Sequence, residues 1–225
     1  MTVTPAVIVF DVNETLSDMS AMDQVFTRAG APAPLAKLWF ATVLREGFAL
    51  AATEDATRFA DIGTEVLTGL LGSAGVDDPD GTAARLTAAV AGLPLHPDVA
   101  PGIRALRAAG HRLVTLSNGS AQVAERLMGA AGIDGEFDRF LSVEDAPAWK
   151  PHRASYQYAA RRCQTPEEQM LLVAVHPWDV HGAGRAGLRT AWVNRTEAAY
   201  PSYYVRPDLT VTSLTELAPA LATSW

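Results

Sequence analysis

The sequence predicts an α/β fold in which a parallel sheet is covered by helices and interrupted by one helical insertion. Short apolar runs alternate with helical patterns over most of the 225 residues, and such alternation is typical of parallel sheets with right-handed crossovers. The stretch from residue 18 to residue 93 breaks the alternation and has helical patterns only. Polar residues follow several of the apolar runs, at the sheet edge where open α/β folds bind their ligands.

The first strand is expected at Val7–Phe10 and ends on Asp11. A short apolar run with β-branched residues is typical of a buried strand. The run therefore delivers the Asp11 carboxylate to the C-terminal edge of the sheet. An aspartate in this place can also do no more than cap a turn.

The rest of the sheet follows from segments with the same apolar character. Five of them are expected to be strands: 112–116, 140–143, 170–175, 190–194 and 209–211. The helical patterns between them cover 100–109, 120–131, 153–163, a short turn at 180–186, and 214–222. Gly110, Gly132 and Gly187 each follow a helical run, as C-terminal caps of helices commonly do.

The insertion is rich in alanine and leucine and predicts about four helices. Because it follows the first strand, we expect it to cover the C-terminal edge of the sheet as a cap. Pro94, Pro97 and Pro101 mark the return to the sheet. The predicted domains are therefore a core of residues 1–17 and 94–225 and a cap of residues 18–93.

Composition narrows the class of protein. A net charge of -7 without a local Lys/Arg cluster argues against nucleic-acid binding. No apolar run approaches the roughly 20 residues that a membrane span needs, and the first apolar run lacks the basic segment of a signal peptide. The single cysteine, Cys163, excludes an internal disulfide and is expected to be a structural thiol. We therefore expect a cytoplasmic protein that binds neither membrane nor nucleic acid.

Four polar groups stand at or near the ends of strand-like runs: Asp11, Ser117-Asn118, Lys150 and Asp179. Taken singly, each has an ordinary structural explanation, such as a helix N-cap at Asn118 or Ser120 or a solvated surface lysine. Ser117 and Asn118 also precede a helix, whose N-terminal N–H groups can bind an anion. The four together are much less easily explained by structure alone.

The order and context of these residues resemble the haloacid dehalogenase superfamily, and most closely its hydrolytic (S)-2-haloacid dehalogenases. The resemblance covers nearly the whole chain and implies a Rossmann-like core. It also implies that Asp11 is the nucleophile, that the hydroxyl of Thr15 holds it, and that Ser117 and Asn118 bind the substrate carboxylate. Lys150 would pair with the nucleophile, and Tyr156, which could equally be a packing residue, would support Lys150 and Asp179.

Position 13 bears on the reaction class. Superfamily phosphatases carry there an aspartate that acts as acid and base, but this chain has Asn13, which cannot exchange a proton. No second carboxylate follows Asp179 in residues 180–184, and a magnesium site wants about six oxygen ligands. His176 and His181 have no third ligand with zinc-site spacing. We therefore expect no metal and no cofactor.

Several positions depart from the resembled family. Phe40 stands where the family has the arginine that meets the leaving halogen, and Arg45 could replace that arginine only if the helix packs differently. His176 replaces an asparagine. We interpret it either as a packed residue bonded to a backbone carbonyl or as a neutral imidazole that orients the hydrolytic water. Substrate contacts are expected from Asn13, Phe40, Arg45, Ser117, Asn118 and Trp178.

The expected reaction is hydrolysis of a short 2-haloalkanoic acid through an ester on Asp11. Asp179, and in the second interpretation His176, would position the water, and Lys150 would offset the developing negative charge. Two alternatives stay open: a magnesium-dependent phosphatase of the same superfamily, and a catalytically silent relative that binds a small anion or a partner protein. Relatives in the family suggest a homodimer.

Overall fold

The computed structural model describes residues 5–224. Its sheet has six parallel strands in the order β3-β2-β1-β4-β5-β6. The strands are β1 (Val7–Phe10), β2 (Arg112–Ser117), β3 (Arg139–Ser142), β4 (Met170–Ala174), β5 (Arg189–Val193) and β6 (Leu209–Val211). This α/β architecture confirms the predicted fold class.

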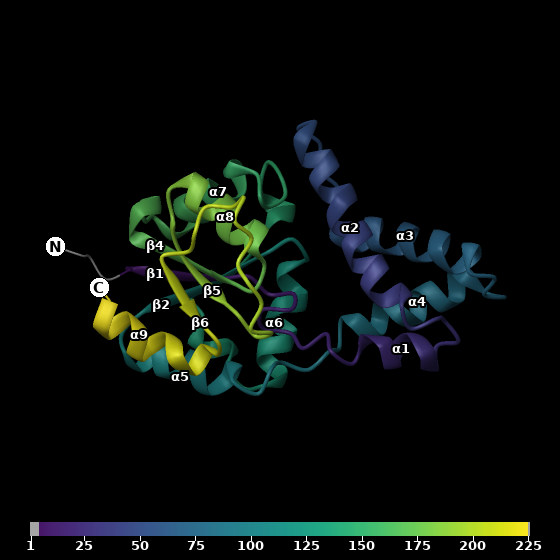
Figure 1. The fold of residues 1–225 in the computed structure, drawn as a ribbon, viewed down its shortest axis with the longest axis horizontal. Coiled ribbons are helices and arrows are strands. Elements are labelled where there is room, and N and C mark those ends of the chain that lie inside the picture. Colours follow the sequence, from purple (N-terminus) through teal and green to yellow (C-terminus); the bar gives the residue numbers. More distant parts are fainter. Residues whose placement is uncertain (1–4, 225) are drawn as a thin grey trace.

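Helices cover both faces of the sheet (Figure 1). The side chains of β1 alternate between the faces, as in any strand: Ile8 and Phe10 join one buried cluster, and Val7 and Val9 join the other. The first cluster includes residues of α5 (Val99–Ala108), α6 (Ala121–Ala130) and α9 (Leu217–Ser224). The second includes residues of α7 (Arg153–Cys163) and α8 (Pro177–Ala186).

The chain reverses its direction of winding between β1 and β4, which are neighbours in the sheet. Ligands of open α/β folds bind at such a switch point, outside the carboxyl ends of the strands. Phe10 pairs with Val173 in the register of these strands. Residues 11 and 175–176 therefore come together just beyond the sheet.

One element begins earlier than the sequence pattern indicates. The short turn expected at 180–186 is a full helix, α8, that starts at Pro177. Proline fits the first position of a helix because its fixed φ is helical and its missing N–H would be unpaired there. Asp179 therefore lies in the first turn of a helix.

The predicted insertion forms helices that lie to one side of the sheet (Figure 1). They are α1 (Met22–Arg28), α2 (Leu35–Ala52), α3 (Phe59–Ser73) and α4 (Pro79–Val90). The two connections to the core run together, with a β-bridge between Ser17 and Leu95 and a hydrogen bond from Asp18 N–H to the Pro94 carbonyl (2.7 Å). On this basis we propose the cap at 18–93; residues 1–4 and 225 of the expected core lie outside the described residues.

Trp149, in the core, is buried in the cap. Its indole N–H donates to the Thr57 carbonyl (2.9 Å), and its ring stacks on Phe59 with 5.8 Å between centroids. A Cβ atom on Gly47 would overlap the ring. Because Gly47 has no side chain, the Trp149 indole can pack directly against α2.

No helix in residues 5–224 is both long and apolar enough to cross a membrane.

Candidate active site

Asp11 lies just beyond β1 and is almost fully buried. Its Oδ2 accepts a hydrogen bond from the Thr15 hydroxyl (2.6 Å), and its Oδ1 accepts one from Lys150 Nζ (2.8 Å). Thr15 in turn accepts from the Val175 N–H (3.1 Å), which ties the loop to the end of β4. Burial would raise the pKa of Asp11, but Lys150 and His176 outweigh it and hold the pKa well below its usual range. Asp11 is an ionised carboxylate with a fixed orientation.

Lys150 is fully buried and bridges two carboxylates. Its Nζ lies 2.8 Å from Asp11 Oδ1 and 2.6 Å from Asp179 Oδ2. Burial would lower the pKa of Lys150, but the two carboxylates raise it above its ordinary value, so the ammonium stays charged. Asp179 is also bonded through Oδ1 to the Tyr156 hydroxyl (2.6 Å), and burial raises its pKa. Tyr156 thus supports Asp179 directly and Lys150 through it.

Asp179 has no exposed surface, and each of its oxygens already accepts a hydrogen bond. In this arrangement its carboxylate holds Lys150. Water positioning by Asp179 stays a prediction.

The motif after β2 contributes in two ways. Ser117 Oγ accepts from the Gly119 N–H (2.9 Å), so the hydroxyl hydrogen of Ser117 remains available to an acceptor. The Asn118 side chain is bonded to the backbone of Lys150 at both ends, by Nδ2 to the carbonyl (3.2 Å) and by Oδ1 to the N–H (3.0 Å). Asn118 therefore positions the lysine segment, which sequence reasoning did not anticipate.

His176 follows β4, and both of its ring nitrogens face carboxylates. Nδ1 lies 3.1 Å from Asp11 Oδ2, and Nε2 lies 2.8 Å from Glu14 Oε2. Burial lowers the pKa of His176, but these two partners outweigh it and raise the pKa to about 9. The ring is therefore bonded to two carboxylates and not to a backbone carbonyl, and the raised pKa favours the imidazolium over the expected neutral imidazole at neutral pH. A role of His176 in orienting the hydrolytic water stays a prediction.

Phe40 and Trp178 flank the His176 ring. Their ring centroids lie 6.2 Å and 5.0 Å from it, and Trp178 stacks at 30°. Lys150 Nζ lies 5.9 Å from the centre of the Trp178 ring. Phe40, from α2 of the cap, therefore packs against a residue of the site, and its contact with substrate stays a prediction.

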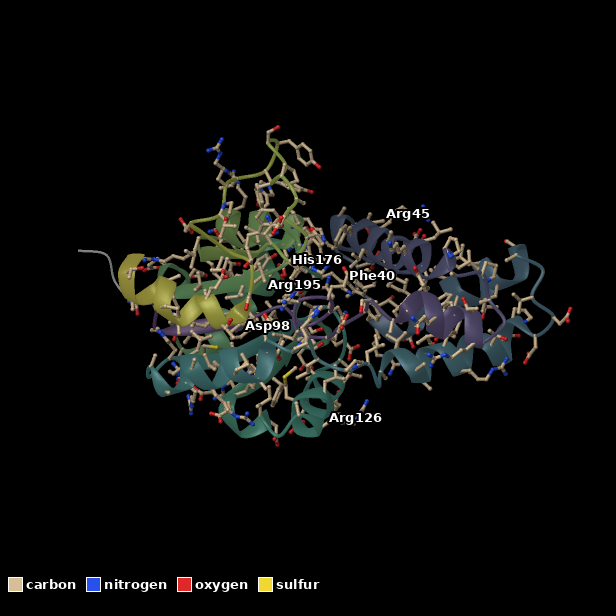
Figure 2. The ribbon with its side chains drawn as sticks, turned by 60° about the horizontal axis from the view of Figure 1, so that its bottom comes forward. Phe40, Arg45, Asp98, Arg126, His176 and Arg195 are labelled. Atoms are coloured by element: carbon tan, nitrogen blue, oxygen red, sulfur yellow. The ribbon has the colours of Figure 1, made fainter. Side chains whose placement is uncertain are left out.

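Arg45 is not at the site. Its side chain is 71% exposed and pairs with Glu46 at 2.6 Å. Figure 2 shows Arg45 at the outer surface of the cap, while Phe40 and His176 lie where the cap meets the core. The expectation that Arg45 contacts substrate is wrong because α2 presents Phe40 to the core and turns Arg45, five positions later, toward solvent.

Two cavities flank the nucleophile loop. A small cavity of about 110 Å³ is mostly apolar and is lined by Asn13 and Ser117, with Trp39, Phe59 and Leu127. A larger cavity of about 640 Å³ is lined on the other side by residues that include Glu14, Phe40, His176 and Arg195. Asn13 and Ser117 thus line the smaller cavity together, and their contact with substrate stays a prediction.

The donor set does not fit a magnesium ion. The place between the two site carboxylates is taken by the Lys150 ammonium. Among residues 5–224, no group of three His, Cys, Asp or Glu side chains could hold a metal ion. Asn13 adds at most one neutral ligand oxygen, well short of what magnesium wants.

A model of the haloacid dehalogenase-like hydrolases matches residues 5–187. The chain belongs to this family of hydrolases. It is 31% identical to haloacetate dehalogenase H-2 of Moraxella sp. (strain B), over 91% of this chain and 92% of the relative. It is 32% identical to (S)-2-haloacid dehalogenase 4A of Burkholderia cepacia, over 95% and 94%. These likenesses confirm the resemblance seen in the sequence.

Solved structures agree with the family assignment. One, described as a dehalogenase with an intermediate complex, superposes on this haloacid dehalogenase-like hydrolase with a TM-score of 0.91 and 28% identity. The match covers 99% of this chain and 100% of that one.

Sequence reasoning missed two residues that support the site of this hydrolase. Arg195 donates through Nη2 to the Thr15 carbonyl (2.9 Å) and is anchored by Asp98 (3.0 Å), so it fixes the nucleophile loop (Figure 2). Glu14 binds His176 from the same loop. An acidic residue three positions after Asp11 was the available signal for Glu14, but its partner lies 162 positions away.

Proposed function

We propose that this protein is a hydrolytic dehalogenase that converts short 2-haloalkanoic acids into 2-hydroxy acids and halide. One observation carries the proposal: the buried carboxylate of Asp11 is held between Thr15 and Lys150 at the switch point, and the next residues of its loop, Val12 and Asn13, line a small apolar cavity. A fixed, ionised carboxylate is a nucleophile that needs no activating base. Asn13, which offers no acid, suits a leaving group that needs no proton.

In the first step, an oxygen of Asp11 attacks the carbon that bears the halogen. The new C–O bond forms as the C–halogen bond breaks, and the halide leaves with the bonding electron pair. The product is a neutral ester of Asp11. Thr15 and Lys150 hold the carboxylate in place, so little freedom is lost when the reacting atoms meet.

The substrate carboxylate lies at Ser117 and the N-terminus of α6. Ser117 has a free hydroxyl hydrogen, and the first N–H groups of a helix attract anions. The short carbon chain then fits the small apolar cavity beside Asn13. Phe40 and Trp178 limit the space on the other side of the nucleophile.

In the second step, water attacks the Cγ atom of the Asp11 ester. The bond between Cγ and the ester oxygen breaks, and that oxygen leaves with the 2-hydroxy acid. Asp179 accepts the proton that water loses, because each of its oxygens has a second lone pair beside the hydrogen bond it already accepts, and burial raises the pKa of its carboxyl group. Lys150 stabilises the negative charge on the departing oxygen.

Labelled water tests this mechanism. In a single turnover in H₂¹⁸O, the label should enter Asp11 while the first product stays nearly unlabelled, and the Asp11 peptide can be analysed by mass spectrometry. Label that appears at once in the product would mean direct attack by water and would overturn the proposal. Halide release from a panel of 2-haloacids, measured beside phosphate release from phosphate esters, separates the dehalogenase from a phosphatase and from a silent relative.

Two further inferences concern the cellular location of the protein and its oligomeric state. We infer a cytoplasmic protein, because its single cysteine is buried and reduced, and cell fractionation tests this. We also infer a homodimer, from the likeness to the family. Light scattering after size exclusion should give twice the chain mass of 23.9 kDa, and a monomer would contradict the inference.

A further inference from the structure

His176 bridges two carboxylates of the nucleophile loop. Its Nδ1 lies 3.1 Å from Asp11 Oδ2, and its Nε2 lies 2.8 Å from Glu14 Oε2. An ionised carboxylate only accepts hydrogen bonds, so both nitrogens must donate and the ring must carry a positive charge. The ring is 11% exposed and lies against Phe40 and Trp178, which restrict its rotation.

The backbone of Glu14 is held in an unfavourable conformation. Its φ is 60°, in the left-handed region that side chains other than glycine rarely adopt. Two neighbours fix this conformation: Ser17 Oγ accepts from the Glu14 N–H (3.3 Å), and His96 Nε2 donates to the Glu14 carbonyl (3.0 Å). Strain that the surroundings maintain in this way is typical of functional sites, and here it directs a carboxylate to His176.

The two oxygens of Asp11 are not equivalent. Within residues 5–224, Oδ2 accepts from both Thr15 (2.6 Å) and His176 (3.1 Å), whereas Oδ1 accepts from Lys150 alone (2.8 Å). Oδ1 therefore has the more available lone pair and is the oxygen that attacks. Once the ester has formed on Oδ1, Oδ2 is its carbonyl oxygen and keeps both donors.

We propose that the Thr15 hydroxyl and the His176 imidazolium bind the oxyanion that forms on Asp11 Oδ2 during ester hydrolysis, and that Glu14 is the positioning residue that keeps His176 charged. The inference rests on the proposed function. When water adds to Cγ, the electron pair of the C=O bond moves to Oδ2, where the two donors receive it. Collapse breaks the Cγ–Oδ1 bond, whose electron pair goes to Oδ1 beside Lys150. The proton left on the new Cγ–OH group passes to Oδ1, which leaves as the hydroxyl oxygen of the product, and Asp11 is again a carboxylate.

Glu14 becomes more important as the reaction proceeds. In the free enzyme, two carboxylates outweigh burial and raise the pKa of His176 to about 9. Ester formation removes the charge of Asp11, and Glu14 is then the remaining carboxylate in contact with the ring. The other titratable groups around the adjoining cavity are Asp18, Asp23, Lys37, His96 and Arg195, and Lys150 lies across Asp11.

The kinetic test separates the two steps with Glu14→Gln. Halide release in rapid-quench experiments should keep a burst near one equivalent per site, because the nucleophile and Lys150 are unchanged. Hydrolysis of the ester should slow by about tenfold or more, since losing a single oxyanion donor costs about 10²- to 10³-fold and this variant removes only the charge. Glu54→Gln is the matched control, because Glu54 also has a positive φ (62°) and its side chain is exposed on the cap.

A pH series gives a second readout that a purely structural role would not move. In wild type the hydrolysis rate should fall on the alkaline side, and Glu14→Gln should shift that limb to lower pH by about one to three units. NMR of ¹³C-labelled histidine should show the same shift for His176, identified by its absence from His176→Asn. Glu54→Gln should change neither.

The outcomes divide cleanly. An unchanged hydrolysis rate and alkaline limb in Glu14→Gln would overturn the inference, and so would loss of the halide burst itself, which would place Glu14 in the first step. No halide release by wild type from any 2-haloacid would overturn the proposed function and the hydrolysis step with it. In that case the NMR titration still supports or overturns the pairing of Glu14 with His176.

Discussion

The ammonium group of Lys150 lies closer to Asp179 than to the nucleophile, at 2.6 Å from Asp179 Oδ2, and neither side chain has any exposed surface. A buried ion pair is held at a desolvation cost, so removing one partner leaves a charge that burial penalises. Asp179 also accepts from the Tyr156 hydroxyl, which leaves the pair little freedom. Stability and catalysis therefore depend on the same three side chains.

Asp179→Asn should lower the free energy of unfolding by about 3–5 kcal/mol, as for other broken buried ion pairs. Urea unfolding followed by circular dichroism measures this. Asp61→Asn is the control: it breaks the exposed pair with Arg58 at 2.8 Å and should leave the free energy of unfolding nearly unchanged, because solvent screens such a pair. Equal effects of the two substitutions on the free energy of unfolding would mean that the buried pair stabilises the protein no more than the exposed pair does.

The stability that His176 contributes should depend on pH. Its pKa is raised from 6.5 to about 9 in the folded protein, so its contribution is fully present below pH 6.5 and is lost as pH rises through 9. We expect the difference in unfolding free energy between wild type and His176→Asn to shrink by about 3 kcal/mol over that window. A difference that stays constant from pH 6 to pH 10 would show that the ring is neutral throughout.

Activity should survive exhaustive chelation. Lys150 occupies the place between Asp11 and Asp179, and Asn13 adds no charge to the site. Halide release is measured after dialysis against EDTA and again after adding magnesium. Loss on chelation that magnesium restores would favour the phosphatase alternative.

Two cap residues that sequence analysis grouped together should behave differently. Arg45→Ala should leave kcat/KM for a 2-haloacid within about twofold, because Arg45 faces solvent and pairs with Glu46. Phe40→Leu should lower kcat/KM by about tenfold, since Phe40 packs on His176 and a changed apolar contact of this size costs about 1–3 kcal/mol. A larger loss of kcat/KM in Arg45→Ala than in Phe40→Leu would mean that the substrate contacts the face of α2 that carries Arg45, and would contradict the proposed site.

Backbone strain at Glu14 can be measured by comparing Glu14→Gly with Glu14→Ala. Both variants remove the carboxylate, but only glycine adopts a φ of 60° without steric cost. Glu14→Gly should therefore be more stable than Glu14→Ala by about 1 kcal/mol in urea unfolding, with equal loss of ester hydrolysis. Equal stabilities would indicate that the loop relaxes when the side chain is removed.

Much of the fold follows from local patterns. The apolar runs predicted the strands to within about a residue, because the four central strands β1, β2, β4 and β5 are almost entirely buried and end where polar residues begin. The start of α8 was harder to predict from the sequence, because proline is typical of loops as well as of the first position of a helix, where Pro177 lies. The cap was recognisable because a long helical stretch cannot take part in a strand–helix alternation.

The residues of the candidate site could likewise be predicted only in part from local sequence patterns. Asp11, Lys150 and Asp179 could be placed together from sequence because parallel strands bring their carboxyl ends to one edge. The charge of His176 could not, because it depends on two carboxylates 165 and 162 positions away along the chain. Arg45 was misplaced for a similar reason: which side of α2 meets the core is decided by packing between domains.

Trp149 and Lys150 are consecutive residues, yet the first is seated in the cap and the second in the reaction centre. The contacts of the Trp149 indole with Gly47 and Phe59 in the cap therefore also fix the backbone that carries the Lys150 ammonium group. A substitution in the cap that displaces the indole should displace Lys150 from Asp11 as well, so cap packing and the reaction centre share one peptide bond.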